Sequence, residues 1–442
     1  MGIDSAFAPG SIHEAALVPV IRTGRAFRVT VILLGSLVLA AVVAFGYQLV
    51  AGIGVTGLND RVFWGIYTVD LVTFIGFSYG GALVSAILRL TNASWRGPIT
   101  RIAEASAVVT LIVGAAFPII HIGHPERVWR VITALQIDSP ITWDMVAITT
   151  YLIATLVLFL LPVTADFGTL RNEGALVGWR RRLYRAGSFG WEGSPAQRRI
   201  LGRSMTLIAL VIIPLAVMVH TVLSYAFSLT SRPGWHSTIF GPYFVVAAIY
   251  SGVAIVVLAV VAYRRFYGLE RFIPARAVIN LGYIMTALGV LYGYLLFTEI
   301  TTEGYVGDES SERLLFALLI DRWAPLFWAF VVLGLAVPLL IVAVKKTRTV
   351  TGVTVAAGLV AGALFLKRFL MFVPPLTQPL IGGEVGSYVP SWVELTITAG
   401  AMAAVPLLML LLFRVVPILS VTEIEEIAEV QESLRGAEVQ AK

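Results

Sequence analysis

The sequence predicts an all-α integral membrane protein with ten transmembrane helices. Of its 442 residues, 58% are hydrophobic and 13% are charged, whereas charged residues make up about 25% of ordinary soluble domains. Apolar segments recur from one end to the other, and Lys and Arg are abundant in every second connection between them. Because so few polar side chains cannot cover this apolar surface in water, we expect the protein to fold in a bilayer.

Ten segments reach the roughly 20 apolar residues that a helix needs to cross about 30 Å of hydrocarbon. In chain order they are 27–52, 62–88, 103–123, 141–165, 204–229, 240–263, 277–300, 323–344, 350–373 and 392–415. No linker separates them, so one membrane domain is expected over 27–416. Glycines such as Gly80 in the second span and Gly289 in the seventh are expected to let helix backbones approach closely.

Positive charge is distributed unevenly between the two sides that these spans define. The termini and the loops after spans two, four, six and eight hold 24 Lys and Arg residues, and the other five loops hold 8. Since cytoplasmic loops carry the excess of Lys and Arg, both termini are predicted to be cytoplasmic. This topology explains the net charge of +6 without nucleic acid as a partner.

Three segments outside the spans are predicted to lie in the cytoplasm. Residues 1–26 are interpreted as an N-terminal segment without an apolar core, and they do not resemble a cleavable signal. Loop 166–203 carries the run Arg180-Arg181-Arg182, which suits anionic lipid headgroups, with a docking surface as the alternative. The tail 417–442 contains an acidic amphipathic helix over 422–430, expected on the cytoplasmic face or against a partner.

Ionisable residues in the apolar segments are concentrated toward one side of the membrane. Such groups are costly at this depth, so each is a functional candidate that needs a partner or a water-filled cavity. The predicted topology places nine of them toward the outer side: Asp70, His121, His124, Asp144, His220, Glu299, Lys367, Arg368 and Glu394. Glu104, at the start of span three, lies toward the inner side.

A quinol site is the sharpest hypothesis for this outer group. A histidine and a carboxylate in an apolar pocket can accept the two protons that a hydroquinone loses on oxidation, and His121 and Asp144 are the first candidates. Lys367 can extend its charge to the surface, whereas Arg368 must pair with a carboxylate or face a cavity. His124 lies closer to water and is interpreted as interfacial, as are the carboxylates that end span seven and begin span ten.

The remaining polar residues of the spans have structural interpretations beside the functional ones. Asp70 is deep enough for either proton relay or structural pairing. His220 is expected to be a hydrogen-bonded core histidine, and Glu104 caps span three near Arg101.

Bound metal is not expected in this chain. It contains no cysteine, which excludes disulfides, thiolate nucleophiles and cysteine-ligated iron–sulfur clusters. A bis-histidine haem needs two facing imidazoles, and His121 and His220 are the two membrane histidines at useful depth. A two-haem cytochrome b is thereby excluded, and electron transfer would require the metal of another subunit.

Short motifs between Trp64 and Pro417 follow an order that resembles the NrfD/polysulfide-reductase family of membrane subunits. They include Trp95-Arg96, His121-Ile122-Gly123-His124-Pro125, Thr142-Trp143-Asp144, Asp166-Phe167-Gly168, Pro233-Gly234-Trp235-His236, Leu366-Lys367-Arg368-Phe369 and Pro390-Ser391-Trp392. The strongest resemblance is to ActC, the larger such protein of bacterial alternative complex III. Tyr79 stands where ActC proteins commonly have a histidine.

The resemblance implies an architecture and a function. It implies two four-helix bundles, spans 2–5 and 6–9, flanked by spans 1 and 10, in a bacterial inner membrane. It also implies menaquinol oxidation near the periplasmic face, with proton translocation as an added possibility. The implied partners are a periplasmic iron–sulfur subunit of the molybdopterin-oxidoreductase type, a second NrfD-like subunit and a multihaem cytochrome c.

By position, the resemblance assigns roles to individual residues. His121 and Asp144 would be the catalytic pair, with His124, Lys367 and Arg368 also at the quinol. A proton path would use residues deeper in the spans: Asp70, Tyr79, Glu104 and His220.

Alternatives remain within and outside this class. The chain could anchor a molybdopterin reductase or hydrogenase that uses the quinone in either direction. A secondary transporter or proton channel is the rival from another class, although transporters usually concentrate polar residues near the midplane. A purely structural anchor is disfavoured by the number of outer polar residues.

Overall fold

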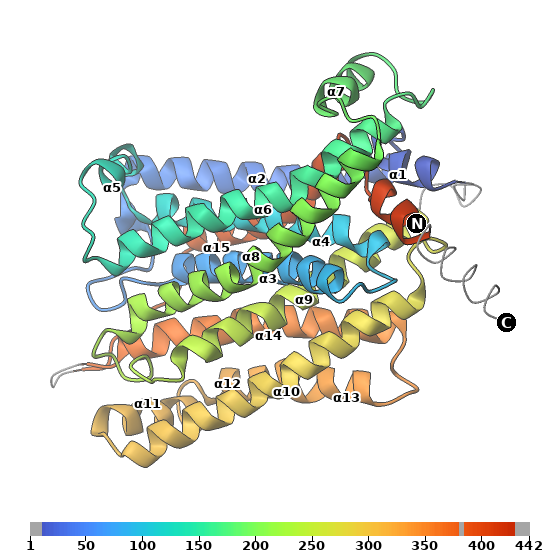
Figure 1. Cartoon of the computed structure of the whole chain (residues 1–442). Helices are drawn as coiled ribbons and strands as arrows, with labels where there is room; N and C mark the ends of the chain where they lie inside the picture. The colour runs from blue at the N-terminus through green and yellow to red at the C-terminus, as the bar shows by residue number, and fades with distance from the viewer. Residues whose placement is uncertain (1–10, 380–383, 429–442) are drawn as a thin grey trace.

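The computed structural model describes residues 11–379 and 384–428, and these residues form helices and connecting loops without a β-strand. Ten of the described helices are long and apolar enough to cross a membrane, which confirms the predicted fold class. They lie side by side along one axis (Figure 1). Their bounds are α2 Arg25–Ala51, α3 Ile66–Leu90, α4 Gly97–His121, α6 Pro140–Leu170, α8 Pro195–Ser228, α9 Phe240–Phe266, α10 Ala275–Val306, α12–α13 Ala324–Ala343, α14 Val350–Thr377 and α15 Trp392–Leu412.

Short helices mark the two ends of this array. At one end lie α5 (Arg130–Thr133) and α11 (Glu309–Leu319), and at the other lie α1 (Ile12–Ile21) and α7 (Trp179–Gly187) (Figure 1). We call the first end the His121 face, because α4 ends there, and the second the termini face. The 3-10 turns Ile53–Val55 and Pro125–Arg127 also lie at the His121 face.

The long helices form the two predicted four-helix bundles. In the first, α3, α4, α6 and α8 pack together, and in the second, α9, α10, α12–α13 and α14 do so. The flanking helices α2 and α15 pack against each other, and α15 also contacts α3 and α4. The sequence-based expectation of two bundles with flanking first and last spans is confirmed.

The two bundles meet where glycines face each other on α3 and α9. A Cβ atom placed on Gly80 would lie 1.9 Å from the carbonyl carbon of Gly252, so no side chain fits at this crossing. On its other side, α3 approaches α4 equally closely, because a Cβ on Gly81 would lie 2.2 Å from the carbonyl oxygen of Ala103. The glycines of the second span thus fix the position of α3, a helix of the first bundle that also contacts the second.

The connection between α6 and α8 is shorter than the predicted loop 166–203. Helix α6 continues to Leu170, and α8 begins at Pro195. The start of α8 is fixed by a capping box in which Ser194 and Gln197 satisfy each other's backbone N–H groups, with proline at the favoured first position.

The chain ends pack together at the termini face, which differs from the prediction. Helix α1 buries its residues 15–20, although residues 1–26 were expected to lack an apolar core. The backbone N–H of Ile418 donates to the carbonyl of Ala16, and residues 418–421 are buried. An apolar run of six residues is too short to resemble a span, and its burial depends on a segment about 400 residues away. Residues 1–10 and 429–442, including Val430, lie outside the described residues.

The eighth span contains a π-helical segment. Residues Val332–Ala336 separate α12 (Ala324–Val331) from α13 (Val337–Ala343). The hydroxyl of Tyr250 donates a 2.8 Å hydrogen bond to the carbonyl of Gly334, which supplies a partner to a backbone group that the irregular turn leaves available.

Candidate functional site

His121 is the last residue of α4 and is half-buried at the His121 face. Its Nε2 lies 3.0 Å from the carbonyl oxygen of Phe63, and its ring meets that of Tyr67 at 6.2 Å. The Tyr67 hydroxyl donates a 2.6 Å hydrogen bond to Gln48, which donates to the carbonyl of Ile120. With Nε2 donating to Phe63, the Nδ1 lone pair of His121 is free to accept a proton.

Asp144 lies near the start of α6 at the same face. Proline at position 140 begins this helix after Ser139. The Oδ1 atom of Asp144 is buried and has no hydrogen-bond partner. The predicted pair therefore shares one face of the first bundle, but the two residues differ in their contacts: His121 contacts Phe63 and Tyr67, whereas Asp144 Oδ1 has no partner.

Four side chains with unpaired polar atoms lie in the first bundle and at its junction with the second, and we call them the unpaired chain: Asp144, Tyr79, His220 and Arg368. Among these four residues, the Tyr79 ring meets the His220 imidazole of α8 edge-on at 4.6 Å. Polar atoms of all four side chains lack a hydrogen-bond partner: Asp144 Oδ1, Tyr79 Oη, both ring nitrogens of His220 and Arg368 Nη1. Each such atom costs about 1–3 kcal/mol when it stays unpaired, so the chain requires a ligand or water.

The neighbours Lys367 and Arg368 point into different bundles. Lys367 Nζ lies 4.0 Å from Glu299 of α10 and 5.5 Å from the centre of the Tyr243 ring, within the second bundle. Arg368 donates a 2.8 Å hydrogen bond to Ser251 of α9, at the junction of the bundles. Both side chains are buried. Arg368 thus lies at the junction of the two bundles, whereas Lys367 lies within the second bundle.

Two further carboxylates occupy the region between α3 and α15. Asp70 is fully buried, accepts a 2.6 Å hydrogen bond from Thr398 through Oδ2, and has no partner at Oδ1. Glu394 was interpreted as interfacial but is buried, and it accepts hydrogen bonds from Tyr388 and the backbone of Gly57 and Ser391. Glu394 is satisfied by this loop, whereas Asp70 keeps a free acceptor atom.

His124 lies in the exposed turn after α4. Its Nδ1 is 3.0 Å from the carboxylate of Glu126, and both side chains are largely exposed. This position agrees with the interfacial interpretation. It places His124 on the surface of the His121 face rather than within the bundle.

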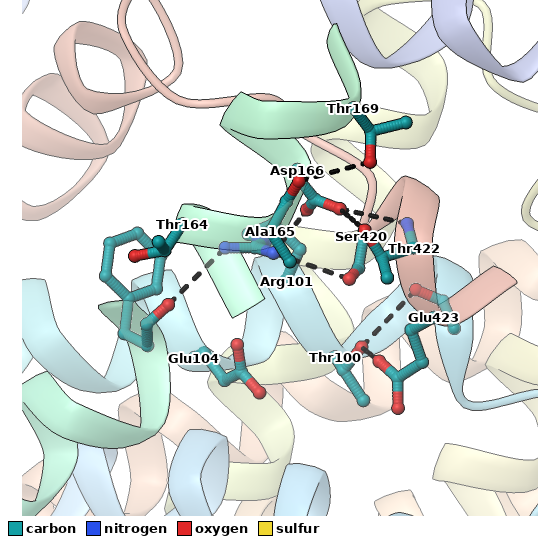
Figure 2. Close-up of polar contacts among 12 residues, drawn as sticks. Thr100, Arg101, Glu104, Thr164, Ala165, Asp166, Thr169, Ser420, Thr422 and Glu423 are labelled. Carbon is teal, nitrogen blue, oxygen red and sulfur yellow. Dashed lines mark hydrogen bonds and ion pairs between the residues drawn. The ribbon is translucent and has the colours of Figure 1, made fainter. Parts of the chain in front are cut away.

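A second polar cluster, which the sequence did not reveal, closes the termini face (Figure 2). Arg101 of α4 and Asp166 of α6 form a 2.6 Å ion pair with no exposed surface, and Asp166 also accepts from the backbone and hydroxyl of Thr422. Glu423 accepts from Thr100 and forms an ion pair with Arg96. These pairs join residues up to 327 positions apart, so no local pattern could have predicted them.

Glu104 lies one helical turn along α4 from Thr100, beside this cluster (Figure 2). It is buried and accepts a 2.7 Å hydrogen bond from Ser85 of α3. The contact of Glu104 is therefore with a neighbouring helix rather than with the start of its own. Among the residues that the structure describes, no group of three or more His, Asp or Glu could hold a metal ion.

Comparison with known proteins agrees with the all-helical membrane fold of this chain. The family model described as "Polysulphide reductase, NrfD" matches residues 54–379. An Archaeoglobus fulgidus protein named Hdr-like menaquinol oxidoreductase integral membrane subunit is 26% identical over 88% of this chain and 95% of its own length. A Mesobacillus selenatarsenatis protein named as a subunit of selenate reductase is 23% identical over 87% and 93%. A Halobacterium salinarum protein, provisionally named as a membrane subunit of dimethyl sulfoxide reductase, is 27% identical over 87% and 91%.

Proposed function

The chain belongs to the NrfD family of polysulphide reductase membrane subunits, and from this premise we propose that it oxidises menaquinol at the His121 face as part of a multi-subunit complex. The relative named as a menaquinol oxidoreductase subunit supports the substrate class. On this proposal, the His121 face is periplasmic, and an iron–sulfur subunit of the molybdopterin-oxidoreductase type covers it. A second NrfD-like subunit and a multihaem cytochrome c would complete a complex of the alternative complex III type.

The chemistry assigns separate acceptors to protons and electrons. Oxidation of a hydroquinone to a quinone releases two protons and two electrons. His121 Nδ1 and Asp144 Oδ1 are the atoms available for the protons, since the first has a free lone pair and the second has no partner. Both electrons pass to the iron–sulfur partner, because this chain contains no cysteine to hold a cluster.

The observation that carries the proposal is the unpaired chain of Asp144, Tyr79, His220 and Arg368. A helix bundle that served only as an anchor would gain stability by replacing these side chains with apolar ones. Their unpaired atoms are explained if hydroquinone oxygen atoms or ordered water occupy the space beside them. A proton path through Tyr79 and His220, with Asp70 and Glu104 as further stations, extends the same proposal. His124 and Lys367 would lie at its periphery.

The test is quinol oxidation by the intact complex with substituted His121 or Asp144. We expect His121→Ala and Asp144→Asn to lower turnover by about 100-fold or more, the usual contribution of a proton-transfer group. Thr149→Ala, on the exposed side of α6, is the matched control and should retain turnover. Full turnover in both site variants, with the complex assembled, would contradict the proposal.

The second candidate is an anchor that delivers electrons from quinol to a molybdopterin reductase, or that reduces quinone in the opposite direction. Two relatives named as reductase subunits favour it. The site residues would be the same, so the acceptor protein that copurifies with the complex separates the two candidates. Proton conduction without quinol chemistry, as in a transporter or channel, predicts normal quinol oxidation in the His121 and Asp144 variants.

A further inference from the structure

An apolar groove of about 410 Å³ lies between the two bundles and the flanking helices. Its lining comes from α2 at Thr30 and Leu34, from α3 at Phe74 and Phe77, from α9 over 255–266 and from α15 over 402–410. The lining of α9 alone extends for about 16 Å at 1.5 Å per residue. The groove therefore runs from the middle of the apolar zone toward the termini face.

The end of this groove nearer the His121 face adjoins unpaired polar atoms. Phe74 and Met402 line the groove, and Asp70 and Thr398 lie four residues before them on α3 and α15. Residues spaced by four share a helix face, one turn apart. The hydrogen-bonded Asp70–Thr398 pair thus lies about 6 Å beyond the lining, at 1.5 Å per residue, and the free Oδ1 of Asp70 belongs to it.

Arg368, at the junction of the bundles, borders the same end of the groove. The guanidinium of Arg368 lies 5.8 Å from the centre of the Phe77 ring, which is part of the lining. Its Nη1 has no partner. An occupant that reached past Phe74 and Phe77 would therefore meet an acceptor on Asp70 and a donor on Arg368.

These features distinguish between two membrane molecules that could fill the groove. A phospholipid acyl chain has no hydrogen-bonding group at its buried end, so it would leave Asp70 Oδ1 unpaired at a cost of about 1–3 kcal/mol. An isoprenoid hydroquinone combines a long apolar tail with a ring whose hydroxyl groups donate and accept. Its ring suits the polar atoms of Asp70 and Arg368 at one end of the groove, and its tail suits the apolar lining from α9 and α15.

We propose that this groove is a second binding site for an isoprenoid quinol, with the ring toward Asp70 and Thr398 and the tail along α9 and α15. The inference rests on the proposed function insofar as the protein meets quinol in its membrane. It differs in location, since the groove opens between α2 and α9 and is lined by neither His121 nor Asp144.

The test is photolabelling of the assembled complex with a menaquinone analogue that carries an azide on its tail. Ala259→Trp fills the groove from α9, and Leu34→Trp fills it from α2, so a folding defect in one variant leaves the other informative. Ala40→Trp, on the exposed side of α2 outside the groove, is the matched control. We expect label on peptides of α9 and α15 to fall about tenfold in the groove variants, equivalent to about 1.4 kcal/mol of binding, and to persist in the control.

Two outcomes would overturn the second site. One is unchanged labelling of α9 and α15 in both folded groove variants. The other is loss of a bound phospholipid, measured by mass spectrometry, with the quinone content per complex unchanged. His121→Ala separates this proposal from the first: it should abolish turnover and leave groove labelling intact. If turnover survived that substitution, the groove labelling would still be decided by Ala259→Trp and Leu34→Trp.

Discussion

Polar residues of the first bundle and of the adjoining helix α15 divide into those whose buried polar atoms have hydrogen-bond partners and those whose buried polar atoms do not. Glu394 and Asp166 are buried, yet every role they play is accounted for by the hydrogen bonds that they accept. Tyr79 and His220 are buried without such partners, and the half-buried Asp144 has a buried Oδ1 atom without one. Since unpaired polar atoms destabilise a fold, their presence points to function more directly than burial or charge does.

Tyr79 and Tyr151 offer a matched pair for this argument. The hydroxyl of Tyr79 is unpaired, whereas that of Tyr151 accepts a hydrogen bond from Ser78 at 3.4 Å. Because the Tyr79 hydroxyl has no protein partner to lose, we expect Tyr79→Phe to lower the free energy of unfolding less than Tyr151→Phe, which removes a hydrogen bond worth about 1 kcal/mol. We also expect Tyr79→Phe to reduce quinol turnover by roughly 10- to 100-fold. Thermal unfolding in detergent and turnover of the complex measure the two effects, and equal destabilisation by both variants would contradict the assignment.

The sequence predicted the end of the helices toward which these residues lie, but not which residues they contact. Charge counting placed His121, Asp144, Asp70 and Arg368 toward one side, because depth in a span follows from position along a helix. It could not show that Lys367 and Arg368 diverge, since that depends on how α14 is rotated between the two bundles. The ion pair of Arg101 with Asp166 joins positions 65 residues apart, and only packing of α4 against α6 reveals it.

At the scale of elements, the crossing of α3 and α9 is the most constrained contact. A Cβ on Gly80 would overlap the backbone of Gly252, so Gly80→Ala must separate the helices or bend them. We expect it to destabilise the protein by about 2–4 kcal/mol, comparable to overpacking or cavity changes in a core. Gly358→Ala on α14 meets no atom within 4 Å and should stabilise its helix by about 0.5–1 kcal/mol. Thermal unfolding compares them, and a tolerated Gly80→Ala would show that the bundles can move apart.

A histidine outside the spans, His13, helps to hold helix α1 against the C-terminal segment. His13 of α1 lies 2.7 Å from Glu173 and 3.1 Å from Glu425. Burial lowers the pKa of His13, but the bonds to Glu173 and Glu425 outweigh it, and the net pKa lies above its ordinary value of 6.5. The stabilisation is therefore complete below pH 6.5 and declines as the pH rises through the raised pKa.

Hydrogen exchange measures this dependence. After correction for intrinsic exchange rates, residues 417–428 should be better protected at pH 6 than at pH 8 in the natural protein. His13→Gln keeps a hydrogen-bonding side chain but cannot titrate, so the difference between the two pH values should disappear. An equal difference in both proteins would assign it to other groups.

The spans were predictable, and so was the helix of the C-terminal tail, since the structure is helical over 421–428 where a helix was expected over 422–430; helix α1 was not predicted. A span is recognised by about 20 consecutive apolar residues, which is a local property. Helix α1 is short, and its contact with the buried residues 418–421 at the other end of the chain could not be read from local sequence. The π-helical turn at Val332–Ala336 likewise depends on packing, since Tyr250 of another helix bonds to it.

The whole molecule combines two similar bundles with different polar contents. The first carries the unpaired chain from Asp144 to His220, and the second buries the Lys367–Glu299 pair among aromatic rings. Arg368 and the α3–α9 crossing lie between them. A displacement of α9 relative to α3 would therefore act on both bundles at once, which makes this junction the place where events in one could reach the other.

The orientation of this asymmetric molecule in the membrane can be tested because the chain has no cysteine. A single cysteine in place of Glu309 reports on the His121 face, and one in place of Ala175 reports on the termini face; both positions are exposed. With 24 Lys and Arg on the side of the termini and 8 on the other, the positive-inside rule predicts that the His121 face is outside. A membrane-impermeant maleimide should then label the Glu309→Cys protein in intact cells and the Ala175→Cys protein in inverted vesicles. The reverse pattern would place His121 and Asp144 toward the cytoplasmic side of the membrane, and protons from quinol oxidation would then be released inside the cell.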